Sequence, residues 1–414
     1  MGRRRDISIL PRLRSWCRKR LSKSGTESQP KSKHVRKESE NLKISGSTDE
    51  GADWHEMLVE SVSTSSGVRF RYRVIEEIGR GTFGTVYKIE TDQPAEDERL
   101  LAMKVLKCRK RGKVREIGMM KMMRHVNLVR LRYYCTVGVC QLGSRQKLIM
   151  DWMPESLHSV ISRHRRDRTL IQPVLYRCFL YQIFRGLAFM HHRAIAHRDL
   201  KPMNILVDVS KGTLKLCDFG SAKVLTDGVS NTSYICSRWY RAPELLFGSR
   251  DYTCAIDMWS AGCCFAEMVR LTPLFRGDST VDQISRILAV LGSPTRQEAA
   301  LLGIRNDDAL PRCSSRDMDS VLERRASQPS VSLLRHLLRY APCDRPKAWD
   351  ALADPFFDEL RQPGCCLPNA VPLPDLFSFT DEELEYNPSI NSQLRPLGAP
   401  AAKESVSNNE SRTS

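Results

Sequence analysis

Three side chains suited to phosphoryl transfer fall within eight positions, from His197 to Asn204. The carboxylate of Asp199 could accept the proton of an attacking hydroxyl, and the ammonium of Lys201 could offset charge on the transferred phosphoryl group. The amide oxygen of Asn204 could bind Mg²⁺. The pattern His-Arg-Asp-x-Lys-x-x-Asn lies between an apolar helical pattern and a Val/Leu-rich strand pattern, which favours a catalytic loop over an ordinary polar turn.

A glycine-rich stretch could approach the phosphates of a nucleotide. Alone, a GxGxxGxV pattern could also open a dinucleotide site or form a plain hairpin. Here it joins two strand patterns, at residues 72–78 and 86–89, whereas the dinucleotide fingerprint joins a strand to a helix. A lid over the phosphates therefore fits better, because glycines carry no side chain that would block the approach. Its residues are Ile78, Gly79, Arg80, Gly81, Thr82, Phe83, Gly84, Thr85 and Val86.

Lys104 lies on a third predicted strand, residues 100–106, twelve positions before Glu116 on a predicted helix, residues 113–123. An ion pair between the two side chains would hold the ammonium against the nucleotide phosphates. As an isolated surface pair it would contribute only about 0–1 kcal/mol. The glycine-rich loop upstream favours the catalytic interpretation.

Asp218 begins an Asp-Phe-Gly triplet after a strand pattern at residues 213–217, where its carboxylate could hold Mg²⁺ against two phosphates. An isolated triplet of this kind is usually a turn. This one follows Asp199 by nineteen positions and precedes an Ala-Pro-Glu triplet that ends at Glu244. The segment between them is predicted to be an activation loop, and Glu244 is expected to pair with Arg345 as a structural brace.

The rest of the pattern divides the chain into a strand-rich and a helical part. Two more strands are predicted at residues 129–136 and 147–151, and helices at 175–192, 256–268, 281–291 and 331–340. The predicted fold class is α+β and bilobal: a strand-rich lobe with one helix, residues 70–153, and a mainly helical lobe, residues 154–360. Residues 361–414 form an extension whose first part is expected to pack.

Positive charge is concentrated near the N-terminus. The net charge is +17, and residues 1–43 supply +10 of it, from eight Arg and six Lys against four acidic residues. Residues 1–65 have few large apolar side chains after Leu21, so a basic, mostly disordered arm is expected. A solvated arm, a nuclear import signal, a membrane-surface patch aided by acylation of Cys17, and an organelle presequence remain open as its role.

The fourteen cysteines include no metal-type pairs, which predicts reduced thiols and a location in the cytoplasm, the nucleus or both. No apolar run approaches the ~18 residues that span a bilayer.

Residues from about 70 to 360 resemble a eukaryotic protein kinase, with every signature in the expected order. The closer resemblance is to the glycogen synthase kinase 3 (shaggy-like) family, and it lies in the segments 233–244, 257–262, 277–283 and 376–380. It implies a monomeric Ser/Thr protein kinase that uses ATP and Mg²⁺ and acts on protein substrates. It also implies that backbone groups of Asp151 and Met153 bind adenine between Val86, Ala102 and Leu206.

The resemblance implies a substrate rule as well. Members of the family favour a Ser or Thr four positions before an already phosphorylated residue, and the positions that bind this priming phosphate are Arg115, Arg198 and Lys223 here. Three converging cations would give charge-assisted hydrogen bonds to the dianion. The alternative is that they bind a phosphate on the protein's own loop, for instance at Thr232.

Tyr234 occupies the activation-loop position that the family commonly phosphorylates, and Arg238 and Arg241 are near enough in sequence to receive that phosphate. Met203 stands where the family usually has Gln, which bears on peptide preference and not on the base or the metal ligands. Gly118 interrupts the helix that carries Glu116 at a cost of about 1 kcal/mol, so a looser helix is expected.

Several other functions fit these residues less well. Ser285 replaces a larger apolar residue in the family's scaffold-docking groove, which weakens the case for a scaffold protein there. A pseudokinase scaffold conflicts with the complete catalytic set. A proline-directed cyclin-dependent or mitogen-activated-type kinase would lack the segment 233–238. Binding of nucleic acid, or peripheral contact with a membrane, would rest on the basic arm alone.

Overall fold

The computed structural model describes residues 54–81, 84–92, 99–106, 114–137, 145–304 and 310–396. Most of the basic arm, and with it each candidate role of that arm, lies outside the described residues. So do Thr82 and Phe83 of the glycine-rich loop.

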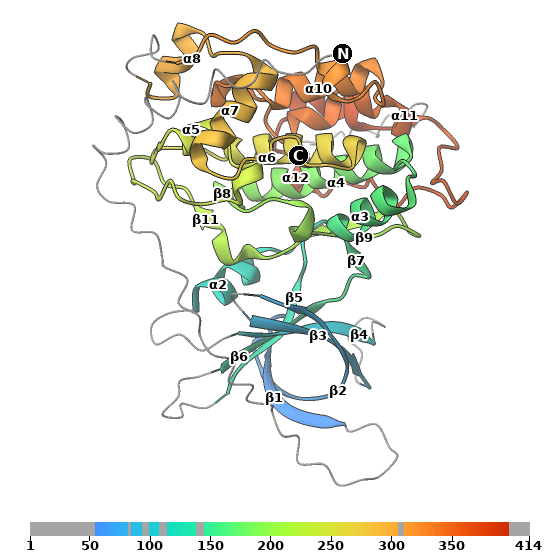
Figure 1. The fold of residues 1–414 in the computed structure, drawn as a ribbon. Coiled ribbons are helices and arrows are strands. Elements are labelled where there is room, and N and C mark those ends of the chain that lie inside the picture. Colours follow the sequence, from blue (N-terminus) through green and yellow to red (C-terminus); the bar gives the residue numbers. More distant parts are fainter. Residues whose placement is uncertain are drawn as a thin grey trace, which may run out of the picture.

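Six strands of the N-terminal part close into a barrel in the order β1-β2-β3-β4-β6-β5, seen at the bottom of Figure 1. Closure comes from antiparallel pairing of Glu60 and Ser61 with Tyr134 and Tyr133. A small apolar cluster that includes Phe70 fills the interior. The elements are β1 (His55–Ser61), β2 (Gly67–Arg80), β3 (Gly84–Thr91), β4 (Leu100–Leu106), helix α2 (Val114–Met122), β5 (Leu131–Val137) and β6 (Arg145–Asp151).

Strand β1 corrects one expectation from the sequence. It lies inside residues 1–65, which were expected to be mostly disordered, and Val59 and Ser61 on it are buried. The strand is ordered because its two neighbours, β2 and β5, supply the hydrogen bonds that a lone seven-residue strand would lack.

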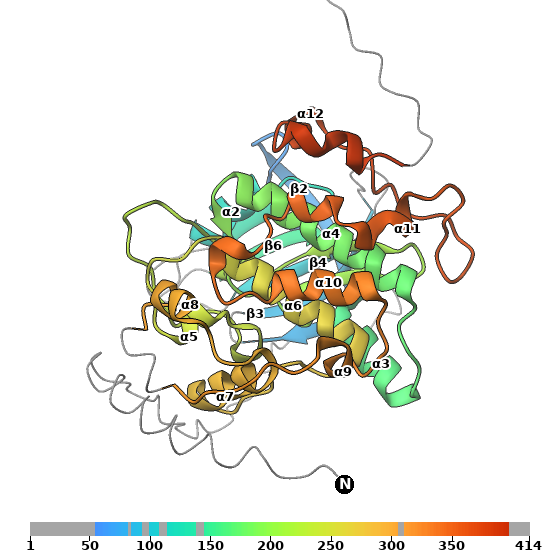
Figure 2. The ribbon, with the colours of Figure 1, turned by 90° about the horizontal axis from the view of Figure 1, so that it is seen from above.

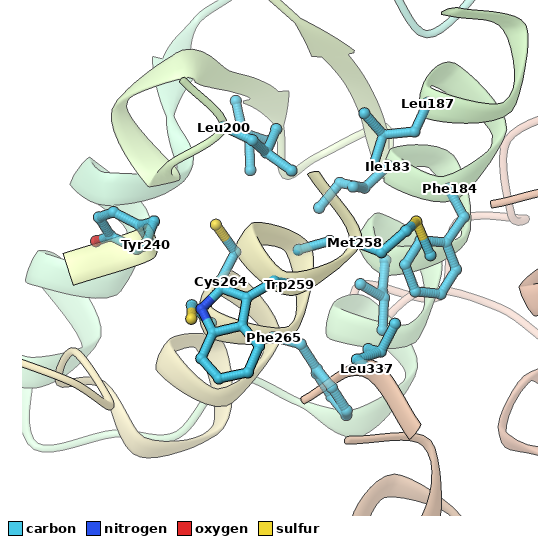
Figure 3. Packing of buried hydrophobic residues seen from close by; sticks show 14 of the residues in the cluster. Ile183, Phe184, Leu187, Leu200, Tyr240, Met258, Trp259, Cys264, Phe265 and Leu337 are labelled. Atoms are coloured by element: carbon cyan, nitrogen blue, oxygen red, sulfur yellow. The ribbon is translucent and has the colours of Figure 1, made fainter. Parts of the chain in front are cut away.

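The helical part is built around α4 and α6, whose buried faces pack against each other. Figure 3 shows Ile183 and Phe184 of α4 beside Met258 of α6, with Leu337 of α10 on the other side. The α-helices are α3 (Leu157–Asp167), α4 (Pro173–His192), α5 (Pro243–Leu246), α6 (Ala255–Arg270), α7 (Thr280–Leu291), α8 (Arg296–Leu301), α9 (Met318–Val321), α10 (Gln328–Leu337), α11 (Asp358–Arg361) and α12 (Asp381–Leu384).

Short strands lie between the barrel and the helices, and 3₁₀ turns occur both there and within the helical part. Strand β10 pairs with β9, and β9 with β7, while β11 pairs with β8. The strands are β7 (Glu155–Ser156), β8 (Ile195–Ala196), β9 (Ile205–Asp208), β10 (Thr213–Leu216) and β11 (Lys223–Val224). The 3₁₀ turns are η1 (Pro202–Asn204), η2 (Phe219–Ser221), η3 (Arg238–Tyr240), η5 (Pro342–Asp344), η6 (Asp350–Ala353), η7 (Pro355–Phe357) and η8 (Pro388–Leu394).

The expected brace between Glu244 and Arg345 is present. Two guanidinium nitrogens of Arg345 donate to the two carboxylate oxygens of Glu244, at 2.7 and 2.8 Å, and both side chains are buried. Arg345 also donates to the carbonyl oxygen of Ala255, the first residue of α6. The pair therefore fixes the end of the activation segment to the helical core.

The extension after α11 packs through residue 394. Helix α12, coloured red in Figure 2, lies at the margin of the molecule opposite α7 and α8. In the described ranges, no helix is both long enough and apolar enough to cross a membrane.

Candidate active site

A cleft of about 570 Å³ lies between the barrel and the helical part. The barrel contributes the glycine-rich loop, Lys104 and the C-terminal end of β6. The helical part contributes Met203 and the start of the activation segment. The predicted nucleotide-binding residues that line it are Ile78, Gly79, Arg80, Gly81, Gly84, Val86, Ala102, Lys104, Asp151, Met153 and Leu206. Thr85 is not among the described lining residues; it lies on β3, paired with Arg80 on β2.

Lys104 of β4 binds two carboxylates at the back of the cleft. Its ammonium nitrogen lies 2.7 Å from Oε1 of Glu116 on α2 and 3.1 Å from Oδ1 of Asp218. Burial alone would lower the pKa of this ammonium, but the charges of Asp218 and Glu116 outweigh burial and raise the pKa overall. For the carboxyl of Asp218 the signs are opposite: burial raises its pKa, and the charge of Lys104 more than reverses that effect, so the pKa is lowered overall. The Lys104 ammonium and the Asp218 carboxylate are therefore both charged at neutral pH.

The carboxylate of Asp199 accepts hydrogen bonds on both oxygens. Oδ2 receives the ammonium of Lys201 at 2.7 Å and the amide of Asn204 at 3.2 Å. Oδ1 receives the backbone N–H and the hydroxyl of Ser237, at 3.0 and 2.9 Å. Lys201 also donates to the Ser237 hydroxyl at 3.0 Å. The loop thus holds an alcohol, a carboxylate and an ammonium in mutual contact.

Asp257 of α6 binds the backbone of the catalytic loop. Its carboxylate accepts the backbone N–H groups of His197 and Arg198, at 2.7 and 2.9 Å, and lies 3.0 Å from the imidazole of His191. Burial raises the pKa of this carboxyl, but the bond from His191 reverses the effect, so the pKa is lowered overall. Arg198 has a φ of 67°, a left-handed conformation that the two bonds stabilise.

Asn204 and Asp218 are held side by side. The N–H of Cys217, directly before Asp218, donates to the carbonyl oxygen of Asn204 at 3.0 Å. The Asn204 amide nitrogen is engaged by Asp199, which leaves the amide oxygen as the donor atom for a metal. One carboxylate and one amide oxygen at a cleft edge fit Mg²⁺, which completes its shell with phosphate oxygens and water.

The glycines of the loop differ in what they make possible. A Cβ atom on Gly79 or Gly81 would meet nothing within 4 Å, so both leave the backbone open toward the cleft. A Cβ atom on Gly84 would come within 2.3 Å of the carbonyl oxygen of Val105 on β4. Gly84 is therefore required for packing of β3 on β4, which the sequence interpretation did not distinguish.

Asp151 has a second role that the sequence did not reveal. Its backbone was predicted to meet adenine, and the residue does line the cleft. Its buried side chain faces the other way and accepts from Arg132 at 2.7 Å and Lys215 at 3.1 Å. The segment that joins the two lobes is thereby fixed to strands on both sides.

Two of the three predicted phosphate-binding cations converge on one stretch of the activation segment. Lys223 donates to the amide oxygen of Asn231. Arg198 donates to the hydroxyl of Tyr252 at 3.1 Å, and that hydroxyl donates to the carbonyl oxygen of Thr232 at 3.0 Å. Arg115 lies in the first turn of α2, but its side chain is outside the described ones.

Tyr234 is 76% exposed, and the guanidinium of Arg241 lies 4.9 Å from the centre of its ring. Arg238 lies on the same segment and donates to the carbonyl oxygen of Asp278 at 2.7 Å. The Nε atoms of Arg238 and Arg241 are buried without a hydrogen-bond partner. The guanidinium beside the exposed tyrosine is therefore that of Arg241, whereas the Arg238 side chain is bound to the loop before α7.

The roles of Ser237 and Asp257 were not predicted from the sequence. Both belong to segments that carry the family resemblance, but no spacing rule connects them to Asp199 or Arg198, from which they are 38 and 59 residues distant. Only the folded chain brings them to the catalytic loop.

A glycine-rich loop, an ion-paired lysine and a catalytic loop with a carboxylate and a lysine at one cleft define the class of protein kinases. The protein kinase domain family matches residues 72–357. Protein kinase gsk3 of Schizosaccharomyces pombe is 39% identical over 349 residues, which cover 81% of this chain and 89% of the relative. The chain belongs to the glycogen synthase kinase 3 family of eukaryotic protein kinases. It is a Ser/Thr protein kinase that uses ATP and a divalent metal ion, and its substrates are proteins.

Proposed function

We propose that this kinase transfers phosphate from Mg·ATP to a Ser or Thr that lies four residues before an existing phosphate. Asp199 is the base for the substrate hydroxyl, and Lys201 stabilises charge in the transition state. Lys104, held by Glu116, contacts the nucleotide phosphates. Bound Mg²⁺, held by Asn204 and Asp218, would neutralise charge on those phosphates.

The contact between Ser237 and Asp199 supports the assignment of the base. The Ser237 hydroxyl donates to Oδ1 of Asp199 at 2.9 Å and accepts from Lys201 at 3.0 Å. This is the pair of contacts that a substrate hydroxyl needs at the moment of proton transfer. A serine of the protein's own loop shows that the carboxylate can accept from an alcohol here.

Two cations without an anionic partner carry the proposal for priming. In the part of the chain that the structure describes, neither Arg198 nor Lys223 forms an ion pair. The guanidinium of Arg198 donates to the carbonyl oxygen of Ser221 and to the Tyr252 hydroxyl, and Lys223 donates to the amide oxygen of Asn231, so the acceptors are neutral. Arg198 is only 6% exposed. Buried or half-buried cations without a counter-ion favour an anionic ligand, because burial of an unpaired charge is costly.

A peptide pair tests the proposal. One peptide is made with and without phosphate at the fourth position after its target Ser, and kcat/KM is measured for both. We expect the primed form to be preferred by about tenfold or more, the effect of one or two charge-assisted hydrogen bonds. Lys223→Met should reduce that preference and leave the unprimed peptide unchanged, whereas exposed Lys211→Met should change neither.

Equal kcat/KM for the two peptides would overturn priming while leaving the kinase activity in place. Asp199→Asn, assayed with radioactive ATP, is the control for contaminating kinases. The alternative, a phosphate on Thr232 of the same chain, is tested by mass spectrometry and by Thr232→Ala, which should not alter the preference for the primed peptide.

We further propose that Tyr234 is phosphorylated and that Arg241, with Arg238 on the same segment, binds the added phosphate, since the Arg241 guanidinium already lies 4.9 Å from the centre of the Tyr234 ring. Because the Tyr234 side chain is exposed, the active site of another kinase molecule could reach it. A monomeric state, location in the cytoplasm or nucleus, membrane contact through the arm, and the weak case for a scaffold near Ser285 stay predictions from the sequence.

A further inference from the structure

A buried carboxylate of the C-terminal extension connects both lobes. Oε1 of Glu383, on α12, accepts from Nε of Arg185 at 2.6 Å and lies 3.1 Å from Nε2 of His125, and Oε2 accepts from Nη2 of Arg185 at 2.8 Å. Arg185 belongs to α4 of the helical part, whereas His125 follows α2 of the strand-rich part. The side chains of all three residues are at least 95% buried.

The extension holds Glu383 in place from two directions. The carboxylate of Glu383 accepts the backbone N–H of Thr380 at 2.8 Å, and the backbone N–H of Glu383 donates to the Thr380 hydroxyl. These two bonds form a capping box at the start of α12. Arg185 donates to the carbonyl oxygen of Ser378 at 2.6 Å and lies 4.7 Å from the ring centre of Phe379. The carboxylate therefore has little freedom to follow a moving partner.

The protonation of His125 is set by a second contact. Its Nδ1 accepts the backbone N–H of Asn127 at 3.1 Å, so Nε2 carries the proton and donates to Glu383. Burial lowers the pKa of this imidazole. The arrangement is a neutral histidine donating to a carboxylate, and it orients the loop between α2 and β5.

That loop is connected to both of the segments whose carboxylates bind Lys104. On one side α2 ends at Met122, three residues before His125, and carries Glu116. On the other side, Asn127 donates to Gln182 of α4 and to the carbonyl oxygen of Leu214, and its own carbonyl oxygen accepts from Leu216 on β10. Asp218 follows two residues after Leu216.

We propose that Glu383 is a positioning residue for catalysis: through His125 it fixes the loop after α2 and thereby holds Glu116 and Asp218 at Lys104. The proposal rests on the role assigned above to the Lys104–Glu116 pair. Glu383 contacts neither nucleotide nor peptide, so its effect on the reaction passes entirely through the position of α2. The C-terminal extension is then part of the catalytic apparatus as well as of the helical core.

Glu383→Gln tests this with a neighbouring control. Glu382→Gln removes an exposed carboxylate of the same helix, which pairs with Arg193 and, within the described ranges, forms no hydrogen bond or ion pair with the strand-rich part. Hydrogen exchange of α2, kcat, and KM for ATP and peptide are measured for both variants in the full chain. We expect Glu383→Gln to increase exchange of α2 and to lower kcat about three- to thirtyfold with an unchanged peptide KM. Glu382→Gln should match the wild type.

A second variant separates positioning from folding. His125→Gln leaves the Arg185–Glu383 pair intact and should reproduce the loss of kcat, and the double variant should be no worse than either single one, because both act through one contact. Wild-type kcat and wild-type exchange of α2 in His125→Gln, or additive losses in the double variant, would overturn the proposal. Lys104→Met distinguishes failure of this proposal from failure of the role assigned to the Lys104–Glu116 pair: full activity of Lys104→Met would remove that role.

Discussion

The backbone of Arg198 shows how one carboxylate maintains the catalytic loop. A left-handed conformation in a residue other than glycine costs on the order of 1 kcal/mol or more. Asp257 offsets this cost by accepting the two consecutive N–H groups of His197 and Arg198, and His191 keeps the Asp257 carboxyl ionised despite complete burial. Asp199 directly follows Arg198, so the direction of the base depends on a residue 58 positions later in the chain.

Asp257→Asn should therefore weaken both the fold and the reaction. The new amide group retains one oxygen and places an N–H donor against a backbone N–H, which costs about 1–3 kcal/mol. Displacement of Asp199 by a fraction of an ångström should lower kcat by up to about 100-fold. Urea unfolding and steady-state kinetics measure the two effects. Exposed Asp251→Asn is the control, and identical results for the two variants would contradict this role.

Glu267 makes stability depend on pH with a defined sign. Its buried carboxyl accepts from the hydroxyl of Tyr240 at 2.7 Å, yet burial dominates and raises its pKa from 4.5 to about 6. The folded state therefore binds this proton more tightly than the unfolded state. The stability that this group contributes is fully present below pH 4.5 and is lost as the pH rises through about 6.

Glu267→Gln should remove that loss, because glutamine does not titrate. Relative to the wild type, the free energy of unfolding of the variant should improve by about 2 kcal/mol between pH 4.5 and pH 7. Urea unfolding at several pH values measures the difference, in which the contributions of other groups cancel. Parallel pH profiles of the two proteins would show that Glu267 does not titrate in this range.

At the scale of elements, α2 is a short helix with a glycine in its middle. It has only nine residues, and Gly118 lies at its centre on the exposed side. A Cβ atom there would meet nothing within 4 Å. The glycine is thus not required by packing, and its cost is that of backbone entropy.

Gly118→Ala should stabilise the protein by about 0.5–1 kcal/mol and slow hydrogen exchange in α2. Gly262→Ala on α6 is the matched control with the opposite sign, because its Cβ would lie 3.0 Å from Cβ of Leu337. Thermal unfolding and exchange of the unphosphorylated proteins measure both. Strong protection of α2 already present in the wild type would contradict the looser helix inferred from the sequence.

Sequence periodicity predicted the elements whose own residues determine them. The helices α4, α6 and α7 begin and end within three residues of the predicted ranges, and the ion pairs Lys104–Glu116 and Glu244–Arg345 form as expected. Strand β1 was missed because its order depends on pairing with β5, over 70 residues away. Glu383 was missed for the same reason: its partners lie 198 and 258 residues away, and no motif links them.

Over the whole molecule, the apolar interior separates into two unequal clusters. The larger runs from the underside of the barrel, through α2, into the helical part, while the smaller lies inside the barrel. Among the residues that the structure describes, the smaller cluster has eight buried members, all of them on strands. Because local opening follows the amount of buried apolar surface, the barrel should be the first part to open.

Two neighbouring residues of β1 test this at one site. Val59 is 1% exposed inside the barrel, whereas Leu58 on the opposite face is 71% exposed. Val59→Ala removes two buried methyl groups and should destabilise the barrel by about 2 kcal/mol, while Leu58→Ala should change stability by less than about 0.5 kcal/mol. Hydrogen exchange should rise in β1, β2 and β5 and stay unchanged in α6. Equal loss of protection in α6 would mean instead that the two clusters unfold as one cooperative unit, and that the barrel does not open alone.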